Sequence, residues 1–507
     1  MSEFDVIVVG FGFAGGIAAI EAHDAGARVL LLDKQASPGG ISVCSFGGLR
    51  VTDDADAAFA YLKATNAGTA PDALLRVLAD GMFALPEQAQ KLADPVRAKL
   101  GKRPSPANYP FEGYDSFGFV TVDELPDGDA AAEFPNARGA PAGARMFKVV
   151  LENIRRRPEI EVRLESSADR LILEGGEVVG VVVRGQRIMA RQAVILTCGG
   201  FEYAAEMQTH SWCIKPVLSA AVRCNTGDGI RMAQSAGAAL WHMWHFHGSY
   251  GFRHPDPAYP FGIRLKRLPD WTPGVGLREN VAMSWILLDQ TGKRFMNEYD
   301  PYLQDTGHRP FEHFDPITQT YPRIPALLVL DADGRELYPL SAPTWHDAEV
   351  AERFRGVTPR QLDDVILTKA DTVDDLAKAT GYDAQTLRAS IATWNKACAA
   401  GEDEAFGRPA SSMVPIRKPP FFAAPVWPVV SNTHGGPVHD AAQRVLDPFG
   451  TPVSRLYAAG ELGSVFGHLY MSGGNIAECF IGGRIAGREA AALAPREVGR
   501  VKVSISG

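Results

Sequence analysis

The stretch that decides the fold is FDVIVVGFGFAGGIAAIEAHDAGARVLLLDK, residues 4–34. Residues 4–9 are an apolar run that predicts a buried parallel strand. The Ala- and Ile-rich segment that follows predicts a helix up to Ala25, and Gly26 marks its end. A second strand is expected over residues 28–32. Strand, helix and strand in this order predict the first unit of a parallel α/β sheet.

Three glycines and one acid give this unit a dinucleotide-binding fingerprint. Gly10, Gly12 and Gly15 have the G-x-G-x-x-G spacing, and Asp33 closes the second strand. The glycines allow a pyrophosphate to approach the helix N-terminus, where N–H groups and the helix dipole favour anions. Asp33 can accept hydrogen bonds from an adenosine ribose. The motif predicts dinucleotide binding without separating FAD from NAD.

The loop after this unit is rich in small residues. It contains Gly39-Gly40-Ile41-Ser42 and then Gly47-Gly48, where a third strand–helix repeat would otherwise follow. Such a loop can lie flat along an extended cofactor, or it can be an ordinary flexible connection. The sequence of the loop alone leaves both interpretations open.

Composition excludes several classes of protein. The chain has 507 residues, 46% of them hydrophobic, and 51 basic against 59 acidic residues give a net charge of -8. Nucleic acid is not an expected partner, because its phosphates need a basic face. No apolar run approaches the roughly 20 residues of a membrane span. The six cysteines form no CxxC pair, and no signal peptide is recognisable, so a cytoplasmic location is expected.

The remainder of the chain predicts a mixed α/β protein. Residues 54–100 have helical spacing, with Pro71 and Pro86 as expected helix starts. Residues 101–145, rich in Pro, Gly and aromatic residues, are expected to form long loops. Alternating Val, Ile and Leu over 161–195 predict an antiparallel meander.

A change in amino-acid composition near residue 240 predicts a second domain. Residues 240–425 carry most of the tryptophans and many prolines, and they are followed by a return to a buried strand at residues 455–461. We therefore expect residues 240–425 to be inserted into a first domain that consists of residues 1–239 and 426–507.

These motifs, in this order, resemble the flavoprotein family of fumarate reductases, succinate dehydrogenases and 3-ketosteroid dehydrogenases. The resemblance covers nearly the whole chain and implies a Rossmann-like FAD-binding domain of the glutathione-reductase type with an inserted α+β substrate, or cap, domain. The matching segments are the glycine turn with Asp33-Lys34, the loop 39–48, VILTCGGFE (194–202), NTGDG (225–229), GKRFMNE (292–298), PPFFA (419–423) and LYAAGE (456–461).

The resemblance implies FAD bound in an extended conformation. The glycine turn would face the pyrophosphate, Asp33 the adenosine ribose, and Glu461 the ribityl chain, with Asn475 near the pyrimidine edge of the flavin. The full set of implied cofactor residues is Gly10, Gly12, Ala14, Gly15, Asp33, Lys34, Gly39, Gly40, Ile41, Ser42, Gly47, Gly48, Ala168, Gly199, Asp228, Glu461 and Asn475.

Noncovalent FAD is expected. Family members that attach the flavin covalently use a His in the loop between the glycine pairs. Here residues 41–46 are ISVCSF, without a His. Cys44 is expected to be a small buried residue. Cys198 stands where the family commonly has Thr, a change that is expected to affect packing alone.

The substrate positions differ from those of the dicarboxylate enzymes. Two carboxylates are best held by bidentate guanidinium groups, so these enzymes need arginines. The catalytic Arg of fumarate reductases lies four residues after the Glu that corresponds to Glu298, and this position is Tyr302 here. The segment GHLYMSGGN, residues 467–475, also lacks Arg, and the family's His-Thr-Met-Gly-Gly is replaced by THGG at 433–436. Fumarate and succinate are therefore not the expected substrates.

The same positions resemble those of ketosteroid dehydrogenases. In these enzymes a Tyr hydroxyl and a Gly amide bind the ring ketone, which implies that role for Tyr470 and Gly474, with Ser472 in the same segment. Tyr302 stands where these families place their catalytic tyrosine. The flavin would exchange a hydride with the substrate, Tyr470 and Gly474 would stabilise charge on the carbonyl oxygen, and Tyr302 would be the acid or base. The ring bond and the direction of reaction stay open.

Two alternatives remain at this stage. One is a reductase of unsaturated acids of the fumarate or urocanate type, with an Arg supplied by Arg223, Arg264 or Arg278. The other is a noncatalytic flavin-binding protein. For the favoured reading, the expected partners are a small hydrophobic substrate, a cyclic ketone or steroid, and an electron donor or acceptor.

One cluster of imidazoles could suggest a metal site. Residues 241–247 are WHMWHFH, but their spacing matches no common ligand motif. We interpret them as packing residues and as a wall of the substrate cavity, to which Tyr250 could belong, and expect no metal there.

Overall fold

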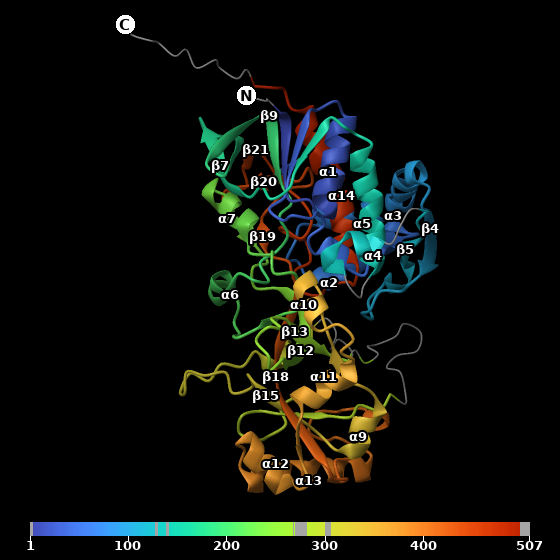
Figure 1. Ribbon diagram of the computed structural model, residues 1–507, viewed down its shortest axis with the longest axis vertical. Coiled ribbons are helices and arrows are strands. Elements are labelled where there is room, and N and C mark those ends of the chain that lie inside the picture. Colours follow the sequence, from blue (N-terminus) through green and yellow to red (C-terminus); the bar gives the residue numbers. More distant parts are fainter. Residues whose placement is uncertain are drawn as a thin grey trace.

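A computed structural model describes residues 4–126, 130–137, 141–266, 268, 281–299 and 306–496. Within these residues the first sheet has the hydrogen-bonded order β20-β21-β9-β1-β2-β6, and β8 and β7 continue from β9 (Figure 1). Its strands are β1 (Phe4–Val9), β2 (Val29–Leu32), β6 (Ile160–Arg163), β7 (Ala168–Glu174), β8 (Glu177–Val183), β9 (Gln186–Leu196), β20 (Arg444–Leu446) and β21 (Pro452–Ala458).

The middle of the first sheet is parallel. β1 pairs in parallel with β2 and β9, so that Val9 lies opposite both Leu32 and Leu196. The carboxyl ends of these strands therefore meet at one edge, where ligands bind in open α/β sheets. β7, β8 and β9 form the expected antiparallel meander. The expectation was wrong at the start of this region, because residues 160–163 form β6 and pair with β2.

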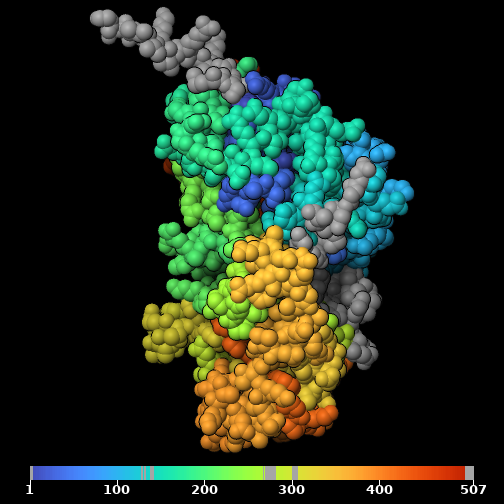
Figure 2. Space-filling model, viewed as in Figure 1, coloured from blue at the N-terminus to red at the C-terminus, as the bar shows by residue number. Residues whose placement is uncertain are grey.

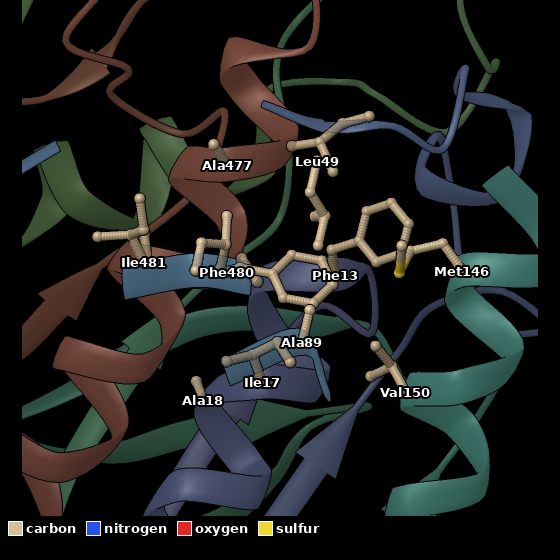
Figure 3. Packing of buried hydrophobic residues seen from close by; sticks show 14 of the residues in the cluster. Phe13, Ile17, Ala18, Leu49, Ala89, Met146, Val150, Ala477, Phe480 and Ile481 are labelled. Atoms are coloured by element: carbon tan, nitrogen blue, oxygen red, sulfur yellow. The ribbon is translucent and has the colours of Figure 1, made fainter. Parts of the chain in front are cut away.

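α1 (Phe13–Asp24) and α14 (Gly474–Ala492) lie against one face of this sheet, and two further helices pack on them. α1 packs between α14 and α5 (Pro141–Arg155), and α3 (Asp72–Ala93) lies on the far side of α14 (Figure 1). Figure 3 shows the core at this junction, where Phe13 lies among Phe480 of α14 and Met146 of α5. The rings of Phe13 and Phe480 are 5.3 Å apart between centroids.

The helices α1 and α14 touch along a stripe of glycines. A Cβ on Gly483 would lie 2.5 Å from the carbonyl oxygen of Ala14, and a Cβ on Gly487 would lie 2.4 Å from that of Ala18. Side chains larger than hydrogen therefore do not fit without moving backbone. This contact fixes the position of α14 relative to the start of α1.

The second sheet has the order β14-β15-β18-β12-β13-β16, and β10 and β17 also pair with β18. On its outer side, α12 and α13 bury Trp394 and Leu376 against β14, β15 and β18 (Figure 1). The bounds are β10 (Leu218–Ser219), β12 (Phe246–Arg253), β13 (Gly262–Leu265), β14 (Ile286–Leu288), β15 (Ala326–Leu330), β16 (Ser341–Ala342), β17 (Thr368–Ala370), β18 (Phe421–Thr433), α12 (Val373–Thr380) and α13 (Ala384–Ala400).

The two sheets lie one above the other along the long axis of the molecule (Figure 1). α10 (Ala348–Arg353) contacts the short helix Pro135–Ala137, and Figure 2 shows this orange segment against the blue-green part of the chain. Strands of the second sheet begin at Leu218 and end at Thr433, so they extend past 240–425 at both ends. The domain boundaries stay a prediction.

A buried ion network fixes the segment GKRFMNE. Glu298 is fully buried and pairs with Arg294 at 2.7 Å and with the equally buried Arg408 at 3.3 Å. Arg294 also reaches Asp403. Arg408 donates to the carbonyl oxygens of Met283 and Trp285. The chain is thereby fixed up to a position four residues before Tyr302.

Two local expectations were wrong. Pro86 does not start a helix but lies inside α3, after a separate helix α2 (Ala55–Asn66). Residues 101–145 are not only loops, because β4 (Lys99–Pro104) and β5 (Phe117–Glu124) join β3 (Leu49–Thr52) in a third sheet.

The remaining elements include α4 (Ala130–Glu133), α6 (Ala205–Ser211), α7 (Asp228–Ser235), α9 (Ala332–Leu337), α11 (Pro359–Ile366), β11 (Leu240–Trp241) and β19 (Gly436–Pro437). None of the described helices is long and apolar enough to cross a membrane.

The glycine stripe generates the first prediction. Gly487→Ala should gain about 1 kcal/mol in helix propensity, but overpacking against the Ala18 carbonyl costs about 1–3 kcal/mol. We expect the second effect to dominate and the urea midpoint of unfolding to fall. Glu489→Ala, on the exposed side of the same helix, is the matched control and should leave the midpoint nearly unchanged. A Gly487→Ala protein of raised stability would contradict the close packing.

Candidate functional site

A long pocket opens at the carboxyl ends of β1, β2 and β9. Residues from the glycine turn, the loop 39–42, the start of β7 and the ends of β9 and β21 line it. The sequence-predicted residues that line it are Gly10, Gly12, Ala14, Asp33, Lys34, Gly39, Gly40, Ile41, Ser42, Ala168, Gly199, Asp228 and Glu461. The other predicted cofactor residues, Gly15, Gly47, Gly48 and Asn475, lie outside this lining.

The three glycines of the turn have different tasks. Gly10 has φ +106°, and a Cβ there would lie 2.4 Å from the Thr197 carbonyl oxygen of the strand end beside it. A Cβ on Gly15 would lie 1.8 Å from the carbonyl oxygen of Gly10, so Gly15 allows α1 to pack on the turn. At Gly12 the nearest atom to a Cβ would be Ser42 Oγ, at 3.0 Å, and the residue borders the pocket. Gly12 therefore leaves room for a ligand at the N-terminus of α1.

Asp33 holds the turn in place as well as facing the pocket. Its Oδ2 accepts from the backbone N–H of Phe11 at 2.8 Å, and its Oδ1 accepts from Gln35 N–H at 2.8 Å. Burial raises the pKa of Asp33, and these two hydrogen bonds oppose that rise. Each carboxylate oxygen can still accept a second donor, as the ribose assignment requires.

Lys34 is engaged across the pocket. Its Nζ lies 2.6 Å from Asp228 Oδ2 and 2.8 Å from Thr226 Oγ1. The ion pair joins the end of β2 to the start of α7. Asp228 and Lys34 thus close the Asp33 end of the pocket together.

Glu461 also lines the pocket and is buried. Its Oε1 accepts from Thr433 N–H at 3.0 Å, and Asn225 Nδ2 lies 3.4 Å from Oε2. Glu202, which the sequence showed only as part of a motif, also accepts from Thr433 N–H at 3.0 Å. The structure thus brings two carboxyl groups to one backbone donor.

The Tyr470 segment is close to the second glycine pair. A Cβ on Gly473 would lie 2.6 Å from the Phe119 ring and 3.2 Å from the Gly48 carbonyl oxygen. A Cβ on Gly48 would lie 2.9 Å from the same ring. Glycines on both segments therefore let the loop 470–473 approach the loop that ends at Gly48.

Tyr470 is buried at the N-terminus of α14. Its hydroxyl accepts from the Asn475 N–H at 3.4 Å. The Gly474 N–H, which was expected to serve a substrate carbonyl, donates to the Met471 carbonyl oxygen at 2.8 Å. The start of α14 thus places backbone N–H groups and the positive end of its dipole near the Tyr470 hydroxyl.

Two residues that sequence reasoning missed hold this segment. Arg50 is buried and donates through Nε to the Ser472 carbonyl oxygen at 2.9 Å, and it also bonds the Ser105 carbonyl oxygen. The Tyr109 hydroxyl donates to the Tyr470 carbonyl oxygen at 3.3 Å. No motif signals either role, because the partners are separated by hundreds of residues.

Imidazoles surround the Tyr470 ring. The rings of His247 and His434 have centroids 4.8 and 5.1 Å from it, and His245 stacks on His434 at 4.5 Å. Burial lowers the pKa of His245 and of His434 well below the usual value, so both are neutral at pH 7. In the described part of the chain, no group of three or more His, Cys, Asp or Glu side chains could hold a metal ion.

Asn475 belongs to a polar network below Tyr470. Its Nδ2 donates to Glu478 Oε2 at 2.6 Å, and Ser464 Oγ donates to the same oxygen at 2.8 Å. His434 Nδ1 lies 3.3 Å from Ser464 Oγ. Burial raises the pKa of Glu478 to about 7, against the hydrogen bonds it accepts. These hydrogen bonds fix the orientation of the Asn475 side chain.

The remaining candidates are placed as follows. Tyr302 and Arg278 lie outside the described residues. Arg223 is paired with Asp347, and Arg264 donates to Ser431 Oγ at 3.2 Å. Arg309, which the sequence did not single out, donates to the His468 carbonyl oxygen, two residues from Tyr470.

The cysteines near the pocket are unreactive in character. Cys44 is buried, and its Sγ lies 3.0 Å from the Asn136 carbonyl oxygen. Burial raises the pKa of both Cys44 and Cys198. Their thiols are therefore neutral at physiological pH, as expected of packing residues.

Comparison with known proteins places the pocket in context. A family model described as "FAD binding domain" matches residues 5–476. Among curated proteins, the chain is 28% identical to 4-oxocyclohexanecarboxylate 2-dehydrogenase of Sinomonas cyclohexanicum (91% of this chain, 88% of that protein). It is 27% identical to 3-oxosteroid 1-dehydrogenase of Mycobacterium tuberculosis strain H37Rv (96% and 98%) and 26% identical to the probable fumarate reductase Ifc3 of Shewanella frigidimarina (96% and 74%).

Solved structures show the same fold. The 3-ketosteroid delta1-dehydrogenase of Sterolibacterium denitrificans, in complex with 1,4-androstadiene-3,17-dione, superposes with a TM-score of 0.76 at 23% identity, covering 97% of this chain and all of that one. The open conformation of a flavocytochrome c3 fumarate reductase gives 0.67 at 25% identity (97% and 78%). The expected α/β fold with an FAD-binding sheet is confirmed.

The loop 39–48 generates the second prediction. Because it contains no His and its one thiol is buried and neutral, the yellow chromophore should be released as FAD when the protein is precipitated with acid. Chromatography of the supernatant against FAD and FMN standards identifies it. Flavin that remains with the precipitated polypeptide would contradict noncovalent binding.

Proposed function

The chain belongs to the FAD binding domain family and is an FAD-dependent oxidoreductase, and we propose that it acts on the CH–CH bond beside the carbonyl of a cyclic ketone. The observation that carries the proposal is the Tyr470 hydroxyl, buried at the N-terminus of α14 and 3.4 Å from the Asn475 N–H. Such a hydroxyl can donate to a carbonyl oxygen while accepting from the backbone.

The pocket suits FAD. Gly12 leaves space at the N-terminus of α1 for a pyrophosphate, and Asp33 at the adjacent strand end would bind the ribose. Glu461 would accept from the ribityl chain, and the Gly48–Gly473 contact would lie toward the flavin ring. When bound, FAD supplies the acceptor or donor of the hydride.

Tyr470 would stabilise negative charge on the carbonyl oxygen. Withdrawing electrons from a ketone acidifies the neighbouring C–H, which must lose a proton when a double bond forms. One preorganised donor of this kind contributes about 3–4 kcal/mol. The dipole of α14 supports the same charge. Because the Gly474 N–H is already bonded to the Met471 carbonyl oxygen, it could serve the substrate only as a shared donor.

The surroundings of Tyr470 favour a neutral substrate. His245 and His434 are buried and uncharged, and Phe466 packs edge-on to the Tyr470 ring at 5.3 Å. A carboxylate placed here would receive no positive charge from these rings. A ketone needs only hydrogen-bond donors.

The proton would be exchanged by Tyr302. This assignment follows from its position four residues after Glu298, whose buried ion network fixes the preceding chain. A tyrosine with a pKa near 10 needs a neighbouring donor or cation to act as a base. Residues 240–425 are proposed as the cap that carries Tyr302 toward the flavin.

The names of two relatives support this substrate class. The 3-oxosteroid and 4-oxocyclohexanecarboxylate dehydrogenases are both named for substrates with an oxo group. At 27–28% identity these names support a class of substrate and leave the individual ketone open.

Arg309 favours a second candidate, a reductase of an unsaturated carboxylic acid. Its guanidinium is held by the His468 carbonyl oxygen close to Tyr470, and it is a permanent cation that could pair with a carboxylate. Fumarate reductases are also among the relatives. Substitution of Arg309 separates the two candidates.

The third prediction concerns Tyr470→Phe. If the hydroxyl stabilises a developing oxyanion, this variant should retain FAD but slow turnover by roughly ten- to a thousandfold. The loss should appear in kcat more than in KM, because the bond strengthens in the transition state. Reduction of the flavin by a panel of cyclic ketones, followed by stopped-flow absorbance, measures it.

The control for Tyr470→Phe is Tyr457→Phe, another buried tyrosine, located on β21. Its turnover should stay near that of the native protein. Near-native turnover of Tyr470→Phe together with a large loss in Arg309→Gln would contradict the ketone proposal and favour the unsaturated acid.

A further inference from the structure

Two buried carboxyl groups meet beside the pocket without a cation. Glu202 is 1% and Glu461 7% exposed, and both accept from the single N–H of Thr433 at 3.0 Å. A Cβ on Gly200 would lie 2.9 Å from an oxygen of each. The two oxygens are therefore crowded around one backbone donor, and the two side chains are within hydrogen-bonding reach of one another.

The groups that face this pair are neutral or already engaged. Thr433 N–H, Gly200 N–H and Asn225 Nδ2 are its donors. The thiols of Cys224 and Cys479 lie nearby, and burial raises the pKa of each to about 12, which leaves them uncharged. Among the described residues no Lys, Arg or His forms an ion pair with either carboxyl group, and Lys34 of the same pocket is bound to Asp228.

Electrostatic repulsion prevents Glu202 and Glu461 from both being ionised. Like charges a few ångströms apart in a medium of low dielectric constant cannot both ionise near neutral pH, and one carboxyl group keeps a proton. A hydrogen bond between two carboxyl groups also requires a proton, since carboxylates are acceptors only. Burial, followed by the neighbouring Glu202, raises the pKa of Glu461 well above its usual value.

We propose that Glu202 and Glu461 share one proton and act as a single monoanionic acceptor for FAD, so that the loaded protein holds one more proton at neutral pH than its unfolded chain. Glu202 is then a positioning residue that acts on the cofactor through Glu461. The proton would lie between the two Oε1 atoms, which both accept from Thr433 N–H.

The proton has a consequence for stability. In the unfolded chain both glutamates ionise near pH 4.3, whereas the folded pair retains one proton well above that pH. The folded state therefore binds more protons, and stability falls as pH rises through this window. A difference of one proton raises the unfolding constant about tenfold per pH unit between about pH 5.5 and 8.

The experiment measures urea unfolding of the FAD-loaded protein from pH 5.5 to 8 in four forms: wild type, Glu202→Gln, Glu461→Gln and Glu404→Gln. In either single variant, the glutamine amide can donate a hydrogen bond to the remaining carboxylate. Each substitution should therefore remove the shared proton. The ratio of the wild-type unfolding constant to that of either variant should then rise about tenfold per pH unit. Glu404 is exposed, and its variant should follow the wild type.

The two single variants decide whether the proton is shared. If only Glu461→Gln changes the slope, the proton belongs to Glu461 alone and the proposal is wrong. If neither variant changes the slope, both groups ionise normally and the proposal is also wrong. If either variant fails to fold, the infrared carbonyl absorption of a carboxylic acid is sought in the loaded wild type at about pH 8, above the pKa of Glu478. Absence of a band that shifts in D₂O would overturn the proposal.

Discussion

The structure depends on the close contact between the start of α1 and the strand ends beneath it. A Cβ on Gly15 would lie 1.8 Å from the Gly10 carbonyl oxygen, and a Cβ on Gly10 would lie 2.4 Å from the Thr197 carbonyl oxygen. Only a hydrogen atom fits at either position. The same close packing continues along α1, because Gly483 and Gly487 allow α14 to pack directly against its backbone. Closely packed glycines therefore position two helix N-termini, that of α1 at the pocket beside Gly12 and that of α14 at Tyr470.

The sequence predicted those parts of the fold whose signals are local. Residues 4–34 predicted β1, α1 and β2 because apolar runs, glycine spacing and a terminal acid all indicate the same unit. The predictions failed where packing overrides composition. Residues 101–145 contain turn formers and aromatics, but β5 is a strand that pairs with β3, and β4 is a strand that pairs with β5. Pro86 lies inside α3 because one face of that long helix is buried against α14 and its neighbours on both sides of the proline.

In the candidate site, too, residues with local sequence signals were predicted and residues fixed by long-range contacts were not. Residues that belong to a motif, such as Asp33, Lys34 and Glu461, line the pocket as expected. Arg50 and Arg309 were missed because their partners lie far away along the chain, so that only folding brings them together. Isolated polar residues of this kind look the same in a sequence whether they are solvated or buried. For Gly474 the motif indicated a free amide, whereas the turn before α14 uses that N–H for the Met471 carbonyl oxygen.

The buried glutamates of the site are stabilised by dipoles rather than by cations. Glu461, Glu202 and Glu478 are buried, and their described partners are backbone amides, hydroxyls and carboxamides. His245 and His434 are neutral for the same reason, because burial disfavours every charge that has no partner. An environment of this kind stabilises charge only where donors already point, and at the start of α14 the Asn475 N–H points at the Tyr470 hydroxyl. A ketone whose oxygen becomes negative only during the reaction matches this arrangement better than a permanent carboxylate, whose desolvation would have to be balanced by Arg309 or Arg50, both of which already donate to backbone carbonyl oxygens.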